Sequence, residues 1–316
     1  MRIALITPAG AGSRAGNRHT ALRWAAMLRA AGHRVTVATE WPADAGTELM
    51  LALHARRSHS SMRAFRERHP RRPLLLALTG TDIYRDVRTS AEARESLRLA
   101  DRYIVLQPKA IEKLPHGLRA RAQVIYQSCA TRLRHAPLKR AFRICVIGHL
   151  REEKDPLRAL AALRRIPAHA GIELVQLGDA LDDALAREAR RGMREDRRYR
   201  WLGGVAHARA LRWLASSHAM VISSRMEGGA NVISEAIRIG VPVLASRISG
   251  NVGLLGEDYP GYFALGDDRA LARLMSRAAR DRSFYRRLQH RMRLLRPLAS
   301  PANEDRLLRR AIAAAL

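Results

Sequence analysis

The chain has 316 residues, of which 47% are hydrophobic and 27% are charged, and its formal net charge is +28 at pH 7. This length suits two domains of ordinary size, and the hydrophobic fraction is typical of a globular protein rather than a disordered chain. No apolar run approaches the ~20 residues of a membrane-spanning helix. The two cysteines are too few for a disulfide framework or a zinc site.

The positive charge allows three interpretations: nucleic acid binding, docking on an anionic membrane, or an arginine-rich surface in which a few arginines bind small anions. The charge is spread along the chain without a basic tail, and aromatic residues make up only 5%. We therefore favour the third interpretation, keep the second, and rank nucleic acid binding last. The opening MRIALITPAG predicts a core strand rather than a signal peptide, so a cytoplasmic location is expected.

Short apolar runs alternate with longer amphipathic stretches, a pattern typical of a parallel α/β sheet. An amphipathic helix is predicted over 17–31, and Gly32 just beyond it favours a left-handed cap. Another helix is expected to begin at Ser300–Pro301. The predicted strands begin at Arg2, Arg34, Leu49, Pro73, Arg102, Phe142, Ile172, Tyr199, Ala219 and Val241.

The two sets of strands are separated by a polar, basic stretch, 131–141, which we interpret as a linker. We therefore expect two Rossmann-like domains, residues 1–136 and 137–282. The remaining residues, 283–316, are predicted to form C-terminal helices that cross back to the first domain.

The most informative stretch, 223–246, reads SSRMEGGANVISEAIRIGVPVLAS. A strand, a glycine turn and a helix follow one another, and the helix is expected to end at Gly240. The N-terminus of such a helix presents N–H groups and a partial positive charge, and glycines let a phosphate approach the backbone. The pattern thus indicates a phosphate site, although a tight connection carrying two solvated glutamates, Glu227 and Glu235, has the same spacing.

This stretch resembles the retaining GT-B glycosyltransferases of the glycogen-synthase-like group, in which Glu, seven residues and Glu precede a Gly-x-Pro-Val strand. The resemblance implies a GT-B fold, with two Rossmann-like domains facing each other across a cleft that binds a nucleotide sugar. It implies that Glu227 contacts the transferred sugar and Glu235 the ribose. The turn Gly228, Gly229, Ala230 and Asn231 would then hold the diphosphate.

Two other segments resemble the same family. In VIGHLREEKDP, Lys154 matches a lysine that contacts the donor diphosphate, where its ammonium would offset charge on the leaving nucleotide. His149 stands where the family carries arginine, a departure that weakens the leaving-group clamp or marks another donor geometry. WLGGV resembles the turn that borders the nucleotide base, which adds Gly203 to the implied donor site.

Polar residues also follow the predicted strand ends of the first half, the edge where open α/β sheets bind ligands. Together their cations and N–H groups predict a pocket for a small phosphate-like anion, although either Arg56 or Arg57 alone would be ordinary surface charge. His54 is either a base or orienting donor, or a core histidine with satisfied hydrogen bonds. The predicted acceptor residues are Gly16, Asn17, Arg18, Arg56, Arg57, Thr79, Gly80, Thr81 and Asp82.

The segments GNRHTALRWA, LHARRS and LTGTDIYRD together resemble the selenosugar synthases of selenoneine biosynthesis, over essentially the whole chain. This resemblance implies transfer of a sugar from a UDP-sugar, UDP-N-acetylglucosamine above all, to selenophosphate, forming a carbon–selenium bond and releasing UDP. The catalytic candidates are Glu227, Lys154 and His54.

No cofactor or metal is expected, because the sequence carries no paired acidic motif for a diphosphate-bound metal. The partners are expected to be the UDP-sugar and selenophosphate, without nucleic acid or stable membrane association. Two alternatives stay open: a membrane-surface glycosyltransferase with a UDP-sugar donor and a lipid or polysaccharide acceptor, and a non-enzymatic nucleic-acid binder.

Overall fold

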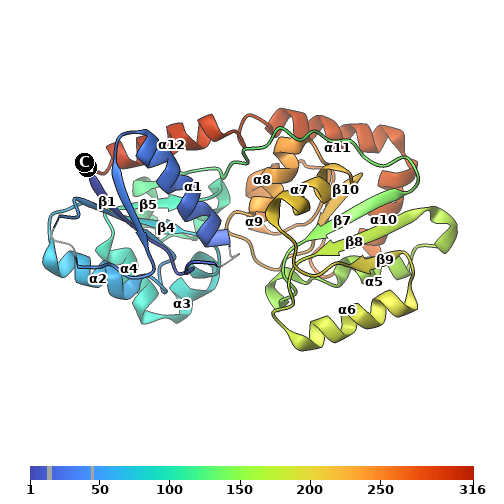
Figure 1. Cartoon of the computed structure of the whole chain (residues 1–316), viewed down its shortest axis with the longest axis horizontal. Helices are drawn as coiled ribbons and strands as arrows, with labels where there is room; N and C mark the ends of the chain where they lie inside the picture. The colour runs from blue at the N-terminus through green and yellow to red at the C-terminus, as the bar shows by residue number, and fades with distance from the viewer. Residues whose placement is uncertain (13–15, 44–45) are drawn as a thin grey trace. The chain divides into compact units, whose positions relative to one another are not determined.

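The structure, a computed structural model, describes residues 1–12, 16–43 and 46–316 (Figure 1). It divides into two compact units: unit 1 comprises Met1–Gln127 and Pro301–Leu316, and unit 2 comprises Ser128–Ser300. Each unit is built on a six-stranded parallel sheet. The prediction of two Rossmann-like α/β domains is therefore confirmed.

The sheet of unit 1 has the strand order β2-β1-β3-β4-β5-β6. Its central strands β3 and β4 are buried along their whole length, as expected where helices cover both faces of a parallel sheet. The strands are β1 (Arg2–Ile6), β2 (Arg34–Ala38), β3 (Leu49–Leu53), β4 (Leu74–Leu78), β5 (Arg102–Val105) and β6 (Ala122–Val124). The α-helices are α1 (Gly16–Ala30), α2 (His59–Arg68), α3 (Val87–Thr89), α4 (Ala91–Leu99) and α12 (Pro301–Ala313).

Side chains of unit 1 point alternately to two apolar cores, one on each face of the sheet. Leu74, Leu76 and Leu78 of β4 pack with α2 and α4 residues on one face. On the other face, Leu75 and Ala77 pack with residues of α1 and α12. Figure 1 shows α1 and α12 near one another beside this sheet.

The C-terminal helix α12 is tied to unit 1 by a buried carboxylate. Glu304 has no exposed surface and accepts hydrogen bonds from Trp24 Nε1 at 2.7 Å and from Arg23 Nε at 2.7 Å. Both donors lie on α1, so the last helix of the chain belongs to the unit that contains the first strand. As expected, the helix begins at Pro301 after Ser300.

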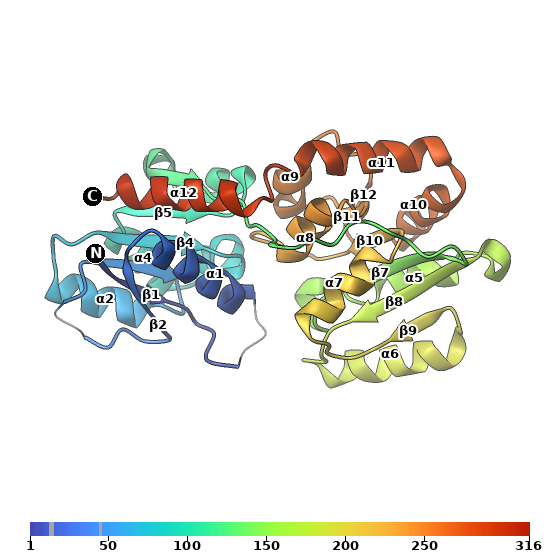
Figure 2. The same ribbon diagram turned by 45° about the horizontal axis from the view of Figure 1, so that its top comes forward.

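The sheet of unit 2 has the strand order β12-β11-β10-β7-β8-β9, and helices pack around it (Figure 2). The strands are β7 (Phe142–Ile147), β8 (Ile172–Leu177), β9 (Tyr199–Trp201), β10 (Ala219–Ile222), β11 (Val243–Ser246) and β12 (Tyr262–Phe263). The helices are α5 (Arg158–Arg164), α6 (Asp183–Glu195), α7 (His207–Ala215), α8 (Asn231–Ile239), α9 (Ser249–Leu255), α10 (Asp268–Arg280) and α11 (Arg282–Leu295).

Several long helices of unit 2 begin at an aspartate that accepts a hydrogen bond from the first turn, the role that a short carboxylate plays best. The caps of α6, α10 and α11 are Asp182, Asp267 and Asp281. At the C-terminus of α8, Gly240 adopts the left-handed conformation (φ 98°) expected from the sequence. Within the three described ranges, no helix is both long enough and apolar enough to cross a membrane.

The division between the units lies earlier than the sequence suggested, at Gln127–Ser128 rather than after residue 136. The predicted linker, 131–141, runs as extended chain along unit 2. Its backbone donates from His135 to Ile239 O and from Ala136 to Ala215 O, at 3.1 and 2.9 Å. The segment 283–316 is also divided, since α11 belongs to unit 2 and α12 to unit 1.

Candidate active site

A lysine–glutamate pair lies at the carboxyl end of the sheet of unit 2. Glu227, in the loop between β10 and α8, is 8% exposed, and Lys154 Nζ donates to its Oε1 at 2.5 Å. Ser224 Oγ donates to the same oxygen at 2.5 Å. The ammonium thus balances a nearly buried carboxylate and stays partly accessible, with 22% of the Lys154 side chain exposed.

The loop that carries Lys154 is fastened to the end of β10. Ser223 Oγ donates to Asp155 O at 2.8 Å, and Arg225 N donates to Glu153 O at 2.9 Å. Asp155 has a left-handed backbone (φ 43°), which turns the chain immediately after Lys154. These contacts fix the backbone of the loop, so the position of the Lys154 ammonium does not depend on the side-chain conformation alone.

The start of α9 packs closely against the Glu227 loop. A Cβ atom on Gly250 would lie 2.0 Å from the Glu227 carbonyl oxygen, so only glycine fits there without a shift. Two hydrogen bonds support the same loop: Ser246 Oγ donates to Ser224 O at 2.7 Å, and Asn251 Nδ2 donates to Ser246 O at 2.9 Å. Sequence reasoning missed these supports, although a polar residue at the carboxyl end of a parallel strand, such as Ser246 at the end of β11, is a usable signal.

Helix α8 follows the glycine turn as predicted. Its N-cap residue, Ala230, has no side-chain oxygen to accept a hydrogen bond from the first turn. Gly228 is buried, while Gly229 and Asn231 are partly exposed at this end of the helix. A negatively charged ligand group can take the place of a capping side chain at such a terminus.

Glu235 lies in the second turn of α8 and contacts His207, the first residue of α7. The two side chains meet at 2.8 Å between Glu235 Oε1 and His207 Nε2. Glu235 is only 12% exposed, whereas His207 is 52% exposed. The histidine therefore orients a carboxylate that the sequence pattern assigns to a ribose.

His149 follows β7, and the WLGGV turn follows β9, next to the end of β8. His149 Nδ1 accepts a hydrogen bond from Asp179 N at 3.1 Å, which leaves Nε2 as the protonated nitrogen of the neutral ring. A Cβ on Gly178 would meet Gly148 O at 2.0 Å, so the two strand ends approach closely. Gly203 (φ 65°) accepts from Gly178 N at 2.8 Å and completes the turn.

In unit 1, the loops after β3 and β4 are joined by a buried aspartate. Asp82 accepts hydrogen bonds from Ala55 N, Thr79 N and Gly80 N, at 3.1, 3.0 and 2.7 Å. Asp82 has no exposed surface, so its carboxylate shapes these loops rather than meeting a ligand directly. It opens a single π-helical turn, Asp82–Asp86.

His54 is held in this network with both ring nitrogens in contact. Its Nδ1 accepts from Arg57 N at 3.3 Å, and its Nε2 lies 3.1 Å from Thr81 Oγ1 and 3.8 Å from Asp86 Oδ2. Burial lowers the pKa of His54, so the ring is neutral near pH 7 with the proton on Nε2. This geometry fits an orienting donor better than a general base. His54 also has a left-handed backbone (φ 78°), a cost tolerated where structure enforces it.

Asp86 is the residue of this cluster that the sequence did not single out. It accepts from Arg56 Nε at 3.1 Å and from Arg85 Nε at 3.0 Å, and its side chain is 4% exposed. Its place four residues after Asp82 was the available signal, because such spacing puts side chains on one face of a helical turn. Arg56 keeps 41% of its side chain exposed beside the pair.

The remaining predicted acceptor residues are less closely joined. Thr79, Gly80 and Thr81 are partly exposed around Asp82, and the Arg57 side chain is exposed. Gly16, Asn17 and Arg18 form the first turn of α1. Among the described residues, no hydrogen bond or ion pair links Asn17 or Arg18 to the loops after β3 and β4.

No group of three or more histidine, cysteine, aspartate or glutamate side chains that could hold a metal ion occurs in residues 1–12, 16–43 and 46–316. Both cysteines, Cys129 and Cys145, are buried. Burial raises the pKa of Cys145 to about 12, which leaves its sulfur protonated and unreactive.

Known structures share this architecture. HepE of Anabaena, solved in complex with UDP, matches with a TM-score of 0.80 at 17% identity, covering 99% of this chain and 100% of its own. Sucrose-phosphate synthase from Thermosynechococcus elongatus matches at 0.76 and 18%, with 99% and 100% covered. The lipopolysaccharide outer core galactosyltransferase WaaB matches at 0.73 and 13%, covering all of both chains. At these identities the likeness shows a common GT-B fold.

The family model described as "Glycosyl transferases group 1" matches residues 132–294, just over half of the chain. The matched region contains Lys154, Glu227 and Glu235, together with the strands and helices that hold them. The chain is thus a member of the group 1 glycosyltransferases, with a GT-B fold.

Proposed function

We propose that this glycosyltransferase transfers a sugar from a UDP-sugar, UDP-N-acetylglucosamine above all, to selenophosphate. The observation that carries the donor half is the Lys154–Glu227 pair beside the uncapped N-terminus of α8, with Glu235 one turn further along. The solved complexes of HepE with UDP and with UDP-glucose support a UDP-sugar as donor.

In this reaction the selenium atom attacks the anomeric carbon of the sugar and forms a carbon–selenium bond. The bond from that carbon to the oxygen of the diphosphate breaks, and its electron pair leaves with UDP. Lys154 and the first turn of α8 stabilise the charge that develops on the diphosphate. Glu227 contacts the transferred sugar, and Glu235 accepts hydrogen bonds from the ribose.

The acceptor assignment is supported by the cluster in unit 1. Arg56 presents a partly exposed guanidinium beside Asp86, and neutral His54 donates from Nε2 to Thr81 Oγ1, which leaves the hydroxyl hydrogen of the partly exposed Thr81 for an acceptor. Such donors suit an anionic phosphate-like acceptor better than a neutral sugar, because arginine pairs with phosphate oxygens through two parallel hydrogen bonds. Selenophosphate is itself a strong nucleophile, so a general base is not required. Water would later cleave the selenium–phosphorus bond to give the selenosugar and phosphate.

Variants in the two units test this division of labour. Glu235→Ala should weaken UDP-sugar binding at least about tenfold, the loss of one good hydrogen-bonded contact. Arg56→Ala should leave donor affinity unchanged and raise the KM for selenophosphate. Arg68→Ala, an exposed arginine of α2, is the matched control for Arg56. Equal loss of donor affinity in the Glu235 and Arg56 variants would contradict the assignment.

A second candidate is transfer to a lipid or polysaccharide acceptor at a membrane surface. It is favoured by the match to WaaB, whose name describes a lipopolysaccharide galactosyltransferase, and by the net charge of +28. It requires binding to anionic vesicles at low salt. If such binding were not observed while selenophosphate supported turnover, the first candidate would stand alone.

A further inference from the structure

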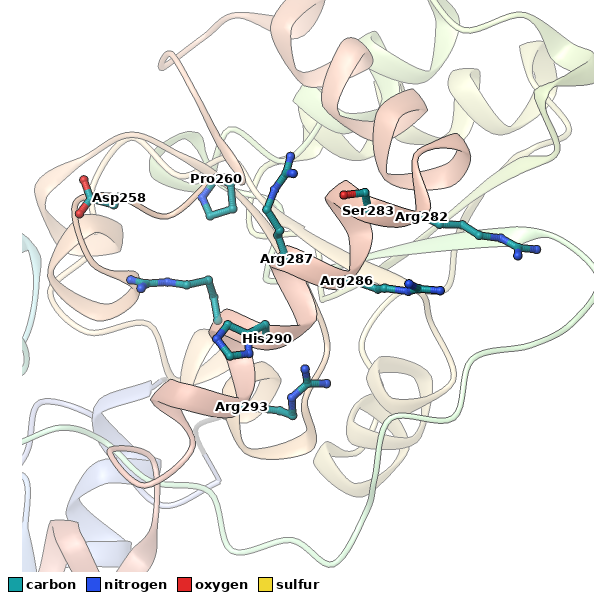
Figure 3. Close-up of a pocket in the computed structure, with 9 residues that line it drawn as sticks. Asp258, Pro260, Arg282, Ser283, Arg286, Arg287, His290 and Arg293 are labelled. Atoms are coloured by element: carbon teal, nitrogen blue, oxygen red, sulfur yellow. The ribbon is translucent and has the colours of Figure 1, made fainter.

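An open groove of about 760 Å³ runs along α11 of unit 2 and lies outside the sequence motifs of the donor site. One side of it is formed by α11, and the other by the segment that contains Asp258 and Pro260, between α9 and β12. Figure 3 shows the side chains of Arg282, Arg286, Arg287 and Arg293 extending from the helix. None of the residues proposed above to bind the donor or acceptor lines this groove.

The groove carries a strong excess of positive charge. Five arginines line it, against a single aspartate, Asp258. Among the described parts of the chain, no carboxylate forms an ion pair with Arg286, Arg287 or Arg293. By contrast, Arg277 on the neighbouring helix α10 pairs with Asp281 at 3.1 Å. Within the described residues, these three guanidiniums of the groove therefore lack the carboxylate partners that other arginines of this unit have.

Arg291 gives a second observation at the inner side of the groove. Its Nη2 lies 3.5 Å from Leu255 O, a long contact, and its Nε is buried without a hydrogen-bond partner among the described residues. Arg291 thus has few acceptors within the described part of the protein, and an oxyanion in the groove would supply acceptors for those of its guanidinium N–H groups that face the groove.

The spacing of the cations favours a ligand with several charges. Residues 282–293 span about 16 Å of helix at 1.5 Å per residue, more than a single phosphate can contact. Leu294 is the one large hydrophobic side chain of this helix that is strongly exposed, so the face is suited to charge recognition rather than to apolar insertion. The planar guanidinium group of arginine can donate two hydrogen bonds to the oxygens of one phosphate group.

We propose that this groove, defined by Arg282, Arg286, Arg287, Arg291 and Arg293, is a binding site for ligands that carry several phosphate groups. The proposal does not depend on the nature of the acceptor or of the donor. A free polyphosphorylated molecule and the phosphates of an anionic lipid surface present the same chemistry, and experiment separates them.

The test uses the full chain and two double variants with equal change of charge. Arg286→Glu/Arg287→Glu alters the groove, and Arg269→Glu/Arg273→Glu alters exposed arginines of α10 that do not line it. Inorganic tripolyphosphate is titrated calorimetrically in the presence of UDP, and orthophosphate serves as the singly phosphorylated comparison. In parallel, vesicles of phosphatidylglycerol are compared with vesicles of phosphatidylcholine.

We expect tripolyphosphate to bind more tightly than orthophosphate, and the groove variant to weaken its binding by at least about tenfold, with little change in the α10 variant. The same pattern with phosphatidylglycerol vesicles would identify lipid phosphate as the source. Unchanged UDP affinity in the groove variant would separate this site from the donor site. Binding to neither probe, or equal weakening in the two double variants, would overturn the proposal.

Discussion

Removal of the Lys154 ammonium should affect stability and activity through different partners. Lys154→Ala takes the cation away from Glu227, whose side chain is 8% exposed, and leaves the Ser224 hydroxyl as the donor to the same oxygen. The carboxylate then carries a nearly buried charge without compensation. The same change removes the group proposed to offset charge on the leaving diphosphate.

The expected loss in the free energy of unfolding follows from the burial of the Lys154–Glu227 pair. Removing one partner of a buried ion pair costs about 3–5 kcal/mol, and the partial exposure of Lys154 places this pair at the lower end, about 3 kcal/mol. For a folding unit of this size, about 1 kcal/mol corresponds to about 2–4 °C in the unfolding midpoint, so Tm should fall by about 6–12 °C. Loss of transition-state charge stabilisation should lower kcat about 100-fold to 1000-fold.

A second substitution separates the two effects. Lys154→Ala/Glu227→Gln removes the orphan charge, so it should regain much of the lost Tm in a thermal melt. It should not regain turnover, because the ammonium is still missing and the sugar contact is altered. If the single and double variants melted together, or if Lys154→Ala melted like the parent chain, the reasoning about this pair would be refuted.

Three further predictions concern other parts of the molecule. Glu304→Ala leaves Arg23 and Trp24 without their buried acceptor and should cost about 3–5 kcal/mol in urea unfolding, while an unchanged midpoint would contradict this role. Gly250→Ala puts a Cβ 2.0 Å from a carbonyl oxygen of the Glu227 loop, so it should lower both Tm and UDP affinity, and a variant with normal binding would show that the loop can shift freely. Burial lowers the pKa of His54 from its ordinary 6.5, so the unfolded chain takes up the proton first and the free energy of unfolding should decrease as pH falls below about 6.5. In His54→Asn, which tolerates a positive φ, this dependence should be smaller in melts between pH 8 and pH 5.5, and an unaltered slope would exclude His54 as a contributor.

Local patterns were sufficient to predict most elements of the fold. Apolar runs marked the longer strands, and helix ends were marked by residues with a specific local role, such as Gly240 in its left-handed cap and Pro301 at the start of α12. Strands β6 and β12 were not predicted, because three and two residues show no period by themselves. Strand β9 is as short as β6 but leads into the WLGGV pattern, which marked its position.

The domain boundary could not be located from composition. The stretch 131–141 is polar and basic, features typical of a linker, yet its backbone groups hydrogen-bond to unit 2. Backbone hydrogen bonds do not depend on which side chains are present, so such an extended segment leaves little trace in the sequence. The physical boundary at Gln127–Ser128 became visible only in three dimensions.

The candidate site shows a similar limit. Glu227, Glu235 and Lys154 lie in recognisable local patterns, so they could be singled out from the sequence. One supporting partner is distant in the chain, since His207 is 28 residues from Glu235. The other, Ser224, is near Glu227 in the sequence but acts only through the orientation of one hydroxyl. Contacts of this kind depend on how helices and strands pack, which no short pattern encodes.

The measurement that tests the central claim most directly is the release of UDP from UDP-N-acetylglucosamine, with and without selenophosphate under anaerobic conditions, followed by mass spectrometry. We predict release that depends on selenophosphate, together with a product of the mass of the seleno-sugar. Binding of the UDP-sugar without selenophosphate-dependent turnover would contradict the acceptor assignment. No binding of UDP or of any UDP-sugar would contradict the proposed donor site itself.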